Sequence, residues 1–194
     1  KAIAEITCSK WVLFHTDAVA AAGVIEVDVD KLKIDLLSLS GHQFYGPKGA
    51  GVLFVRQGTR ITPLIDGGIQ ERGRRAGTEN VAGIVGLGKA AEIAKQEMGN
   101  WAEHILKLRQ RLFAGLNERI EHVCLNGHPD LRLPGNLNFG IKFVEGESIL
   151  ILLDMNGITA SSGSACTSQA LKSSHVLKAM GISPVDAHGS ILFS

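Results

Sequence analysis

Residues 38–51 constrain the fold of this chain more than any other stretch. They follow a short apolar run, residues 34–37, and precede a second one, residues 52–55. Between the two runs lie serine hydroxyls, a histidine and a Gly-Pro-Lys-Gly turn. This pattern predicts two strands joined by a polar site, an arrangement in which hydroxyls and backbone N–H groups can face a cofactor phosphate. On the residues alone, a polar hairpin without chemistry is equally compatible.

Composition and charge exclude several classes of function. The 194 residues are 45% hydrophobic and 20% charged, which is typical of soluble globular chains with a sizeable core. A net charge of +1 gives no field for steering nucleic acid or anionic membrane to the surface. No apolar run reaches the ~20 residues of a membrane span. The cysteines Cys8, Cys124 and Cys166 are odd in number and far apart, which favours a reducing cytoplasm over a disulfide framework.

The remaining pattern predicts an alternation of short strands and helices. Residues 11–14 have the pattern of a buried parallel strand, and Asp17 follows where such a sheet holds ligands. Asp17 could equally cap a helix over residues 18–23. Apolar residues at helical spacing predict helices over residues 80–98 and 101–120, separated by Gly99 and Asn100. Further elements are expected as a helix at residues 1–9, strands at 137–139 and 190–193, and helices at 147–156 and 174–180.

The central stretch resembles the signature of the cysteine desulfurases, the NifS/IscS-like branch of the class-V aminotransferases, which are pyridoxal-phosphate enzymes. That signature reads S-x-S-x-H-K-x-x-G-P-K-G, and the chain matches each fixed position except the lysine, where it has Gln43. In the family, this lysine forms the Schiff base with the cofactor. An amide nitrogen has a delocalised lone pair and cannot condense with an aldehyde, so Gln43 cannot form that link.

The resemblance implies further cofactor contacts, one of which is missing. Asp17 matches the aspartate that lies against the pyridinium nitrogen, whereas Ala20 replaces the glutamine that contacts the phenolic oxygen. Ser40 and His42 match cofactor contacts, the serine at the phosphate. Thr78 matches a threonine that reaches the phosphate bound in the partner subunit, which implies a homodimer with composite sites. Without the resemblance, His42 would be a surface histidine and Thr78 the cap of the next helix.

A second motif carries the sulfur chemistry of the family. Residues 161–166 read S-S-G-S-A-C, and in the family the cysteine of this loop attacks the substrate sulfur and carries it as a persulfide. Cys166 matches this motif in full, among small polar neighbours that make a thiol accessible. Near the end of the chain, Leu192 stands where the family has an arginine that clamps the substrate carboxylate.

The expected architecture is α/β. Residues 1–99 are predicted to be the latter part of a large domain of the pyridoxal-phosphate transferase type, with a mostly parallel sheet. Residues 100–194 are predicted to be a smaller α+β domain with the mobile cysteine loop. The resemblance covers essentially the whole chain but only the second half of the family's length. We therefore expect a fragment or a split protein, for which a companion chain would supply the other half.

The residues favour a desulfurase-like protein of iron–sulfur cluster biogenesis that has lost Schiff-base chemistry. Cys166 would accept and hand on sulfur, or ligate a transient cluster on a scaffold protein. Pyridoxal phosphate is the cofactor that the resemblance implies, without a covalent link here. One alternative is an authentic cysteine desulfurase, converting cysteine to alanine and a persulfide, seen as a fragment or variant. Another is a catalytically dead paralogue that dimerises.

Overall fold

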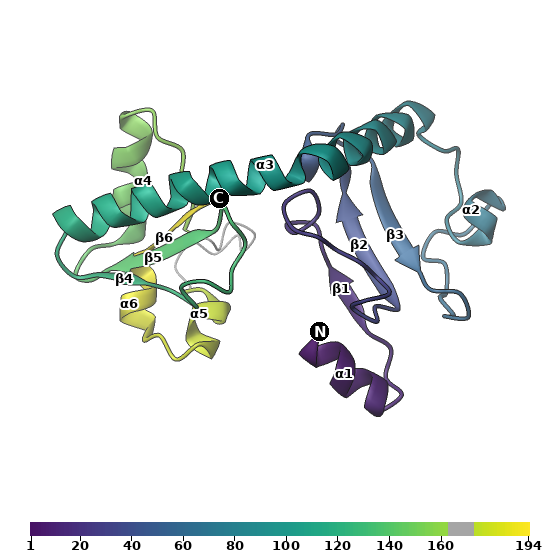
Figure 1. Cartoon of the computed structure of the whole chain (residues 1–194), viewed down its shortest axis with the longest axis horizontal. Helices are drawn as coiled ribbons and strands as arrows, with labels where there is room; N and C mark the ends of the chain where they lie inside the picture. Colours follow the sequence, from purple (N-terminus) through teal and green to yellow (C-terminus); the bar gives the residue numbers. More distant parts are fainter. Residues whose placement is uncertain (163–172) are drawn as a thin grey trace. The chain divides into compact units, whose positions relative to one another are not determined.

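The computed structural model describes residues 1–162 and 173–194, which form two compact units, Lys1–Trp101 and Ala102–Ser194 (Figure 1). Each unit is built on its own three-stranded sheet. Within the described residues, no helix is both long enough and apolar enough to cross a membrane. The assignment of the units to cofactor binding and to a mobile cysteine loop stays a prediction.

The first unit contains a mixed sheet in the order β1-β2-β3. Strands β1 (His15–Asp17) and β2 (Leu36–Ser40) run parallel, and β2 pairs in antiparallel fashion with β3 (Gly51–Val55). Helix α1 (Ala2–Ser9) precedes this sheet in the chain. The predicted α/β class is therefore confirmed, with one parallel and one antiparallel pair of strands in this part of the sheet.

Alternation along β2 gives this sheet one apolar and one polar face. Leu37 and Leu39 belong to the apolar core, which includes the buried Ile34 and continues through Phe44 to the helix residue Ala90. Ser38 and Ser40 have the opposite parity and lie on the other face. In the described part of this unit, side chains that could bind a ligand or react are therefore expected on the polar face.

Two predictions for the start of the chain are wrong in detail. The apolar run at residues 11–14 is not a buried strand: Trp11 is 96% exposed, and β1 begins only at His15. Residues 18–23 form turns rather than a helix, with the N–H groups of Ala21 and Ala22 both bonded to Ala18 O. Only Phe14 of the run packs against the core, so apolar content alone did not locate the strand.

Helix α3 (Val81–Arg119) is continuous, where two helices were expected. A glycine inside a helix destabilises it by about 1 kcal/mol relative to alanine. At Gly99 this cost is too small to interrupt the backbone hydrogen bonds of a 39-residue helix. Asn100 also contributes a local bond, from Nδ2 to Glu97 Oε2 at 3.0 Å. Ahead of α3, Asn80 Oδ1 accepts from Gly83 N at 3.1 Å, so Asn80 provides the side-chain cap that was expected of Thr78.

The second unit is an antiparallel sheet in the order β4-β5-β6, from β4 (Val123–Leu125), β5 (Leu137–Ile141) and β6 (Ser190–Phe193). One face carries Leu137, Phe139 and Ile191, which pack against side chains of α3 and α4 (Gly146–Met155). The opposite face carries Asn138 and Leu192, which are register partners. Helices α5 (His175–Ala179) and α6 (Pro184–His188) follow in the chain before β6.

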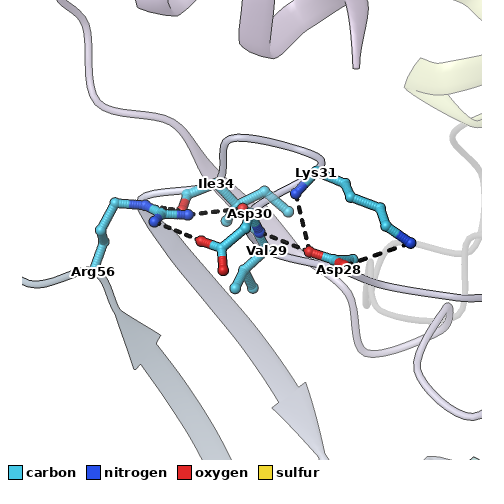
Figure 2. A network of polar contacts seen from close by, with 6 residues as sticks. All are labelled: Asp28, Val29, Asp30, Lys31, Ile34 and Arg56. Carbon is cyan, nitrogen blue, oxygen red and sulfur yellow. Dashed lines mark hydrogen bonds and ion pairs between the residues drawn. The ribbon is translucent and has the colours of Figure 1, made fainter.

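The link between β1 and β2 is fastened to the end of β3 by Arg56 (Figure 2). Its guanidinium donates to Ile34 O at 2.9 Å, to Val29 O at 2.8 Å and to Asp30 Oδ1 at 2.8 Å. Two of these acceptors are backbone carbonyls, and of these Val29 O also accepts the N–H of Ile34 at 2.9 Å. One side chain therefore holds the loop that returns the chain to β2.

Replacing Arg56 with methionine should destabilise the chain, because Ile34 O and Asp30 lose their donor and Val29 O loses one of its two donors. Net contributions near 1 kcal/mol per bond predict a loss of about 2 kcal/mol in the free energy of unfolding. Urea unfolding measures it. The matched change Arg60→Met, at an exposed arginine of the same segment, should cost less than about 0.5 kcal/mol. Equal losses in the two variants would contradict the fastening role of Arg56.

Candidate functional site

The polar face of the first sheet gathers the side chains that the parallel β1–β2 pair brings together. Asp17 is the register partner of Ser38, and His15 shares the parity of Asp17. His15 Nε2 lies 2.8 Å from Ser38 Oγ, which confirms that these residues share one face. The carboxylate of Asp17 accepts the N–H of Val19 at 2.8 Å and remains exposed. A carboxylate, an imidazole and two hydroxyls thus lie on one face of two parallel strands, with Asp17 and Ser40 at the carboxyl ends.

A short 3-10 helix, η1 (Gly41–Phe44), continues the site beyond β2 and carries the histidine and the glutamine. His42 Nδ1 lies 2.9 Å from Ser40 Oγ, and Gln43 Nε2 lies 3.4 Å from His42 Nε2. Because the amide nitrogen of Gln43 can only donate, His42 accepts at Nε2 and carries its proton on Nδ1. Ser40 Oγ then accepts from the imidazole, and its own proton can be donated outward.

The turn after η1 depends on a close backbone approach that favours glycine. Gly46 N donates to Gly41 O at 2.8 Å, and Gly41 N donates to Ala50 O at 3.0 Å. A Cβ atom on Gly46 would lie 2.7 Å from Gly41 O, closer than real contacts allow. Tyr45 closes the helix in the left-handed region, with φ of 67°. The Gly-Pro-Lys-Gly motif therefore holds β2 and β3 at the separation that presents Ser40 and His42.

The site suits pyridoxal phosphate in its non-covalent contacts and not in its covalent one. Asp17 offers an exposed carboxylate for a protonated ring nitrogen, and Ser40 offers a hydroxyl proton for a phosphate oxygen. Gln43 occupies the lysine position, and its amide nitrogen has no reactive lone pair. Lys48 lies in the turn between η1 and β3, is exposed, and shares no described contact with this cluster.

Thr78 lies on a separate segment of the first unit, after α2 (Gln70–Gly73). Both Glu71 and Arg72 adopt left-handed backbone conformations, with φ of 49° and 60°. A residue other than glycine in this conformation destabilises the folded state by about 1 kcal/mol or more, and here two such residues are adjacent. Gly77 N donates to Gln70 Oε1 at 3.1 Å and closes this loop. Thr78 itself is exposed, and no described contact joins it to Ser40 or His42.

The other predicted site residues fall outside this cluster. Ala20 lies in the turn after β1 and has no polar group to offer. Leu192 lies in β6 of the second unit, between Asn138 on one side and Ser161 on the other. Cys166 lies outside the described residues, so its sulfur chemistry stays a prediction from the sequence motif.

Sequence reasoning missed two members of the polar face, His15 and Ser38. Strand periodicity could have identified both, because each lies an even number of residues from a predicted site residue in the same strand and so points to the same face. His15 is two residues from Asp17, and Ser38 is two from Ser40. A strand boundary placed at residue 37 hid this parity, whereas β2 extends to Ser40.

Comparison with known proteins identifies the family of this chain. The family model of the class-V aminotransferases matches residues 1–185. A cysteine desulfurase IscS from Methanosarcina thermophila is 55% identical over 194 residues, covering 100% of this chain and 48% of that protein. A cysteine desulfurase NifS from Azotobacter vinelandii is 50% identical over 192 residues, covering 99% of this chain and 48% of that protein.

Solved structures show the same relationship. A NifS-like protein from Rickettsia africae superposes with a TM-score of 0.89 at 31% identity, over 100% of this chain and 51% of that one. Another NifS-like protein gives a TM-score of 0.84 at 39% identity, over 95% of this chain and 47% of that one. The chain thus spans about half the length of the relatives it matches. It belongs to the class-V aminotransferase family, whose members depend on pyridoxal phosphate, and within that family it is similar to the cysteine desulfurases.

Proposed function

We propose that this chain handles sulfur in iron–sulfur cluster biogenesis through Cys166, without a covalent lysine link to pyridoxal phosphate. The observation that carries the proposal is Gln43, at the lysine position of a motif that otherwise matches. Its amide donates to His42, in a cluster whose other members suit the cofactor. The site thus keeps Asp17, Ser40 and His42 and lacks the amine.

The cofactor, when bound, would supply a ring that withdraws electrons from an attached substrate. The chain's own residues have separate tasks. Asp17 would hold the ring nitrogen in its protonated form, and Ser40 would donate to the phosphate while His42 orients the serine. Gln43 fixes the tautomer of His42 and provides no nucleophile. These groups bind and orient, so carbon–sulfur cleavage is not the activity that they best support.

Sulfur transfer through Cys166 requires only thiol exchange. The Cys166 thiolate attacks the terminal sulfur of a donor persulfide, and a new S–S bond forms as the donor's own S–S bond breaks. The donor leaves as its thiolate with the bonding electron pair, so no external oxidant is needed. The same exchange in reverse delivers the sulfur to an acceptor thiol. A scaffold protein that builds a cluster would be such an acceptor, and the Cys166 thiolate could ligate iron there transiently.

The rival function is an authentic cysteine desulfurase of which this chain is a part or a variant. It is favoured by the intact arrangement of Asp17, Ser40 and His42 on one sheet face. The two functions differ in whether the cofactor must be linked covalently to an amine, which Gln43 lacks. A third candidate, a dimerising paralogue without chemistry, differs from both in what happens at Cys166.

After incubation with pyridoxal phosphate, borohydride reduction should leave residue 43 of the wild-type chain without added cofactor mass, because Gln43 offers no amine. Gln43→Lys should gain the mass of one reduced cofactor at that residue, as intact-protein and peptide mass spectrometry would show. Gln43→Arg, which adds charge without a comparably nucleophilic nitrogen, should gain none. A reduced cofactor adduct on another lysine of the wild-type chain, at a stoichiometry near one, would remove the proposal in favour of the rival.

Cys166→Ser should abolish transfer of labelled sulfur from a low-molecular-weight persulfide to the chain, since the serine oxygen cannot accept sulfane sulfur. Cys8 and Cys124 are exposed free cysteines and serve as matched controls. Their serine variants should retain most of the label that persists after washing. Label retained equally in Cys166→Ser and in Cys124→Ser would leave the dimerising paralogue as the better account.

We further propose that the chain works as a cytoplasmic homodimer, with Thr78 at the phosphate of the partner's site. Support comes from the strained loop before Thr78, since such strain persists where a function uses it. Sedimentation of the chain should give twice its 20.7 kDa mass. A monomer at micromolar concentration, with or without pyridoxal phosphate, would count against this arrangement.

A companion polypeptide should cover the exposed apolar run of the first unit. Trp11, Val12 and Leu13 are 96%, 56% and 59% exposed, beside a β1 strand that pairs on one side only in the described sheet. Adding the half of the Methanosarcina thermophila relative that this chain does not match should shift Trp11 fluorescence to shorter wavelength. Trp11→Phe isolates that signal from Trp101. An unchanged spectrum at saturating partner would exclude this companion.

A further inference from the structure

The second unit contains a cavity of about 290 Å³ on the sheet face opposite its apolar core. Asn138 and Leu192 contribute from that face, and α5 contributes apolar side chains. This volume lies near the lower end of the range for small-ligand sites. The lining residues divide into an apolar wall and a polar one. The apolar wall is Leu131, Val176, Leu177, Met180 and Leu192.

The charge of this cavity is entirely positive among its described lining residues. Arg132 is the one formally charged side chain, and no aspartate or glutamate is present. His128 Nδ1 accepts the N–H groups of Asp130 at 3.0 Å and Leu131 at 2.9 Å. Its ring proton must therefore be on Nε2, which makes the other edge of the ring a donor. Amide nitrogens of Asn126 and Asn138 add further donor capacity.

Among the described residues, no carboxylate forms an ion pair with the guanidinium of Arg132. It donates to the backbone carbonyls of His128 at 2.7 Å and Asn136 at 3.4 Å, and also to that of Asn126. These acceptors are neutral, and none of the ion pairs in the described residues involves Arg132. Burial lowers the pKa of Arg132, and the nearby charge of Arg109 lowers it further. A bound anion would offset both the desolvation of the Arg132 charge and its repulsion by Arg109.

We propose that this cavity binds a small organic carboxylate with an apolar side chain. Three of the five guanidinium N–H groups of Arg132 are used by carbonyls, so two remain for a carboxylate. The carbonyl bonds fix the fork in place, so little side-chain entropy is lost on binding. The wall from α5 and β6 would take the apolar end. The inference concerns the second unit alone and holds whether or not Cys166 carries sulfur.

Binding of N-acetyl-L-leucine to the full chain tests this directly, with N-acetyl-L-leucinamide as the uncharged match and inorganic phosphate as an anion without an apolar part. In ¹⁵N–¹H spectra, the acid should give saturable shifts at Gly127, His128 and Leu177. The amide should bind at least about tenfold more weakly, because it loses the charge-assisted bonds to Arg132. Phosphate should bind more weakly than the acid, because the apolar wall gains nothing from it.

Variants at Leu131 separate the effect of charge on ligand binding from the effect of side-chain shape. This side chain lines the cavity yet is 81% exposed, so replacing it should not affect folding. Leu131→Glu should weaken binding of the acid roughly fivefold relative to Leu131→Gln, since a carboxylate beside Arg132 competes with the ligand. Leu64→Glu, at an exposed leucine of the other unit, should leave binding unchanged. Arg132→Gln should abolish binding.

Three results would overturn the proposal. Equal affinity for the acid and its amide would show that the charge of Arg132 is not used. Phosphate binding as tightly as the acid would show that the apolar wall is not used. Absence of saturable shifts up to about 10 mM of the acid would show that the cavity is no site for this class of ligand.

Discussion

Strand β2 is the element on which the first unit depends, because both of its neighbours are hydrogen-bonded to it. Its alternation sends Leu37 and Leu39 into the core and Ser38 and Ser40 to the opposite face. A slip of one residue in register would exchange the two sets and place hydroxyls in the core. Fold and site are therefore specified by the same five residues. Arg56 supports this register by holding the preceding loop against the end of β3.

The site that results links its polar side chains by hydrogen bonds and has no amine at residue 43. Contacts run from Gln43 through His42 to Ser40, and no buried side-chain nitrogen or oxygen among the described residues lacks a partner. A chain that keeps Asp17, Ser40 and His42 could hold a cofactor and still lack the amine that would attach it. This is the physical basis for separating sulfur handling from carbon–sulfur cleavage.

The sequence predicted the residues of the central motif, whose part in cofactor binding stays a prediction, and it misplaced several element boundaries. Motif positions such as Asp17, Ser40 and His42 depend on chemistry that local residue types reveal. Boundaries depend on pairing between segments, which is why β1 begins at His15 and not within the apolar run before it. Gly99 and Asn100 look like a break because propensity is local, yet α3 continues through them. Asn80 took the capping role expected of Thr78 because the helix begins two residues later than its first-turn signals implied.

The cavity of the second unit could not have been predicted from the sequence at all. Its charge follows from Arg132 donating to three carbonyls of one loop, a contact pattern that no spacing rule encodes. The residue type of His128 does not reveal that its ring accepts two backbone N–H groups. Tertiary contacts, and not residue identity, decide what these side chains can bind.

The rate of alanine formation from L-cysteine, measured with pyridoxal phosphate present, tests the central claim most directly. An amide at residue 43 predicts no alanine above the rate of free pyridoxal phosphate in the same buffer, while labelled persulfide sulfur still reaches Cys166. Alanine released at ordinary enzymatic rates, with multiple turnovers per chain, would contradict the account.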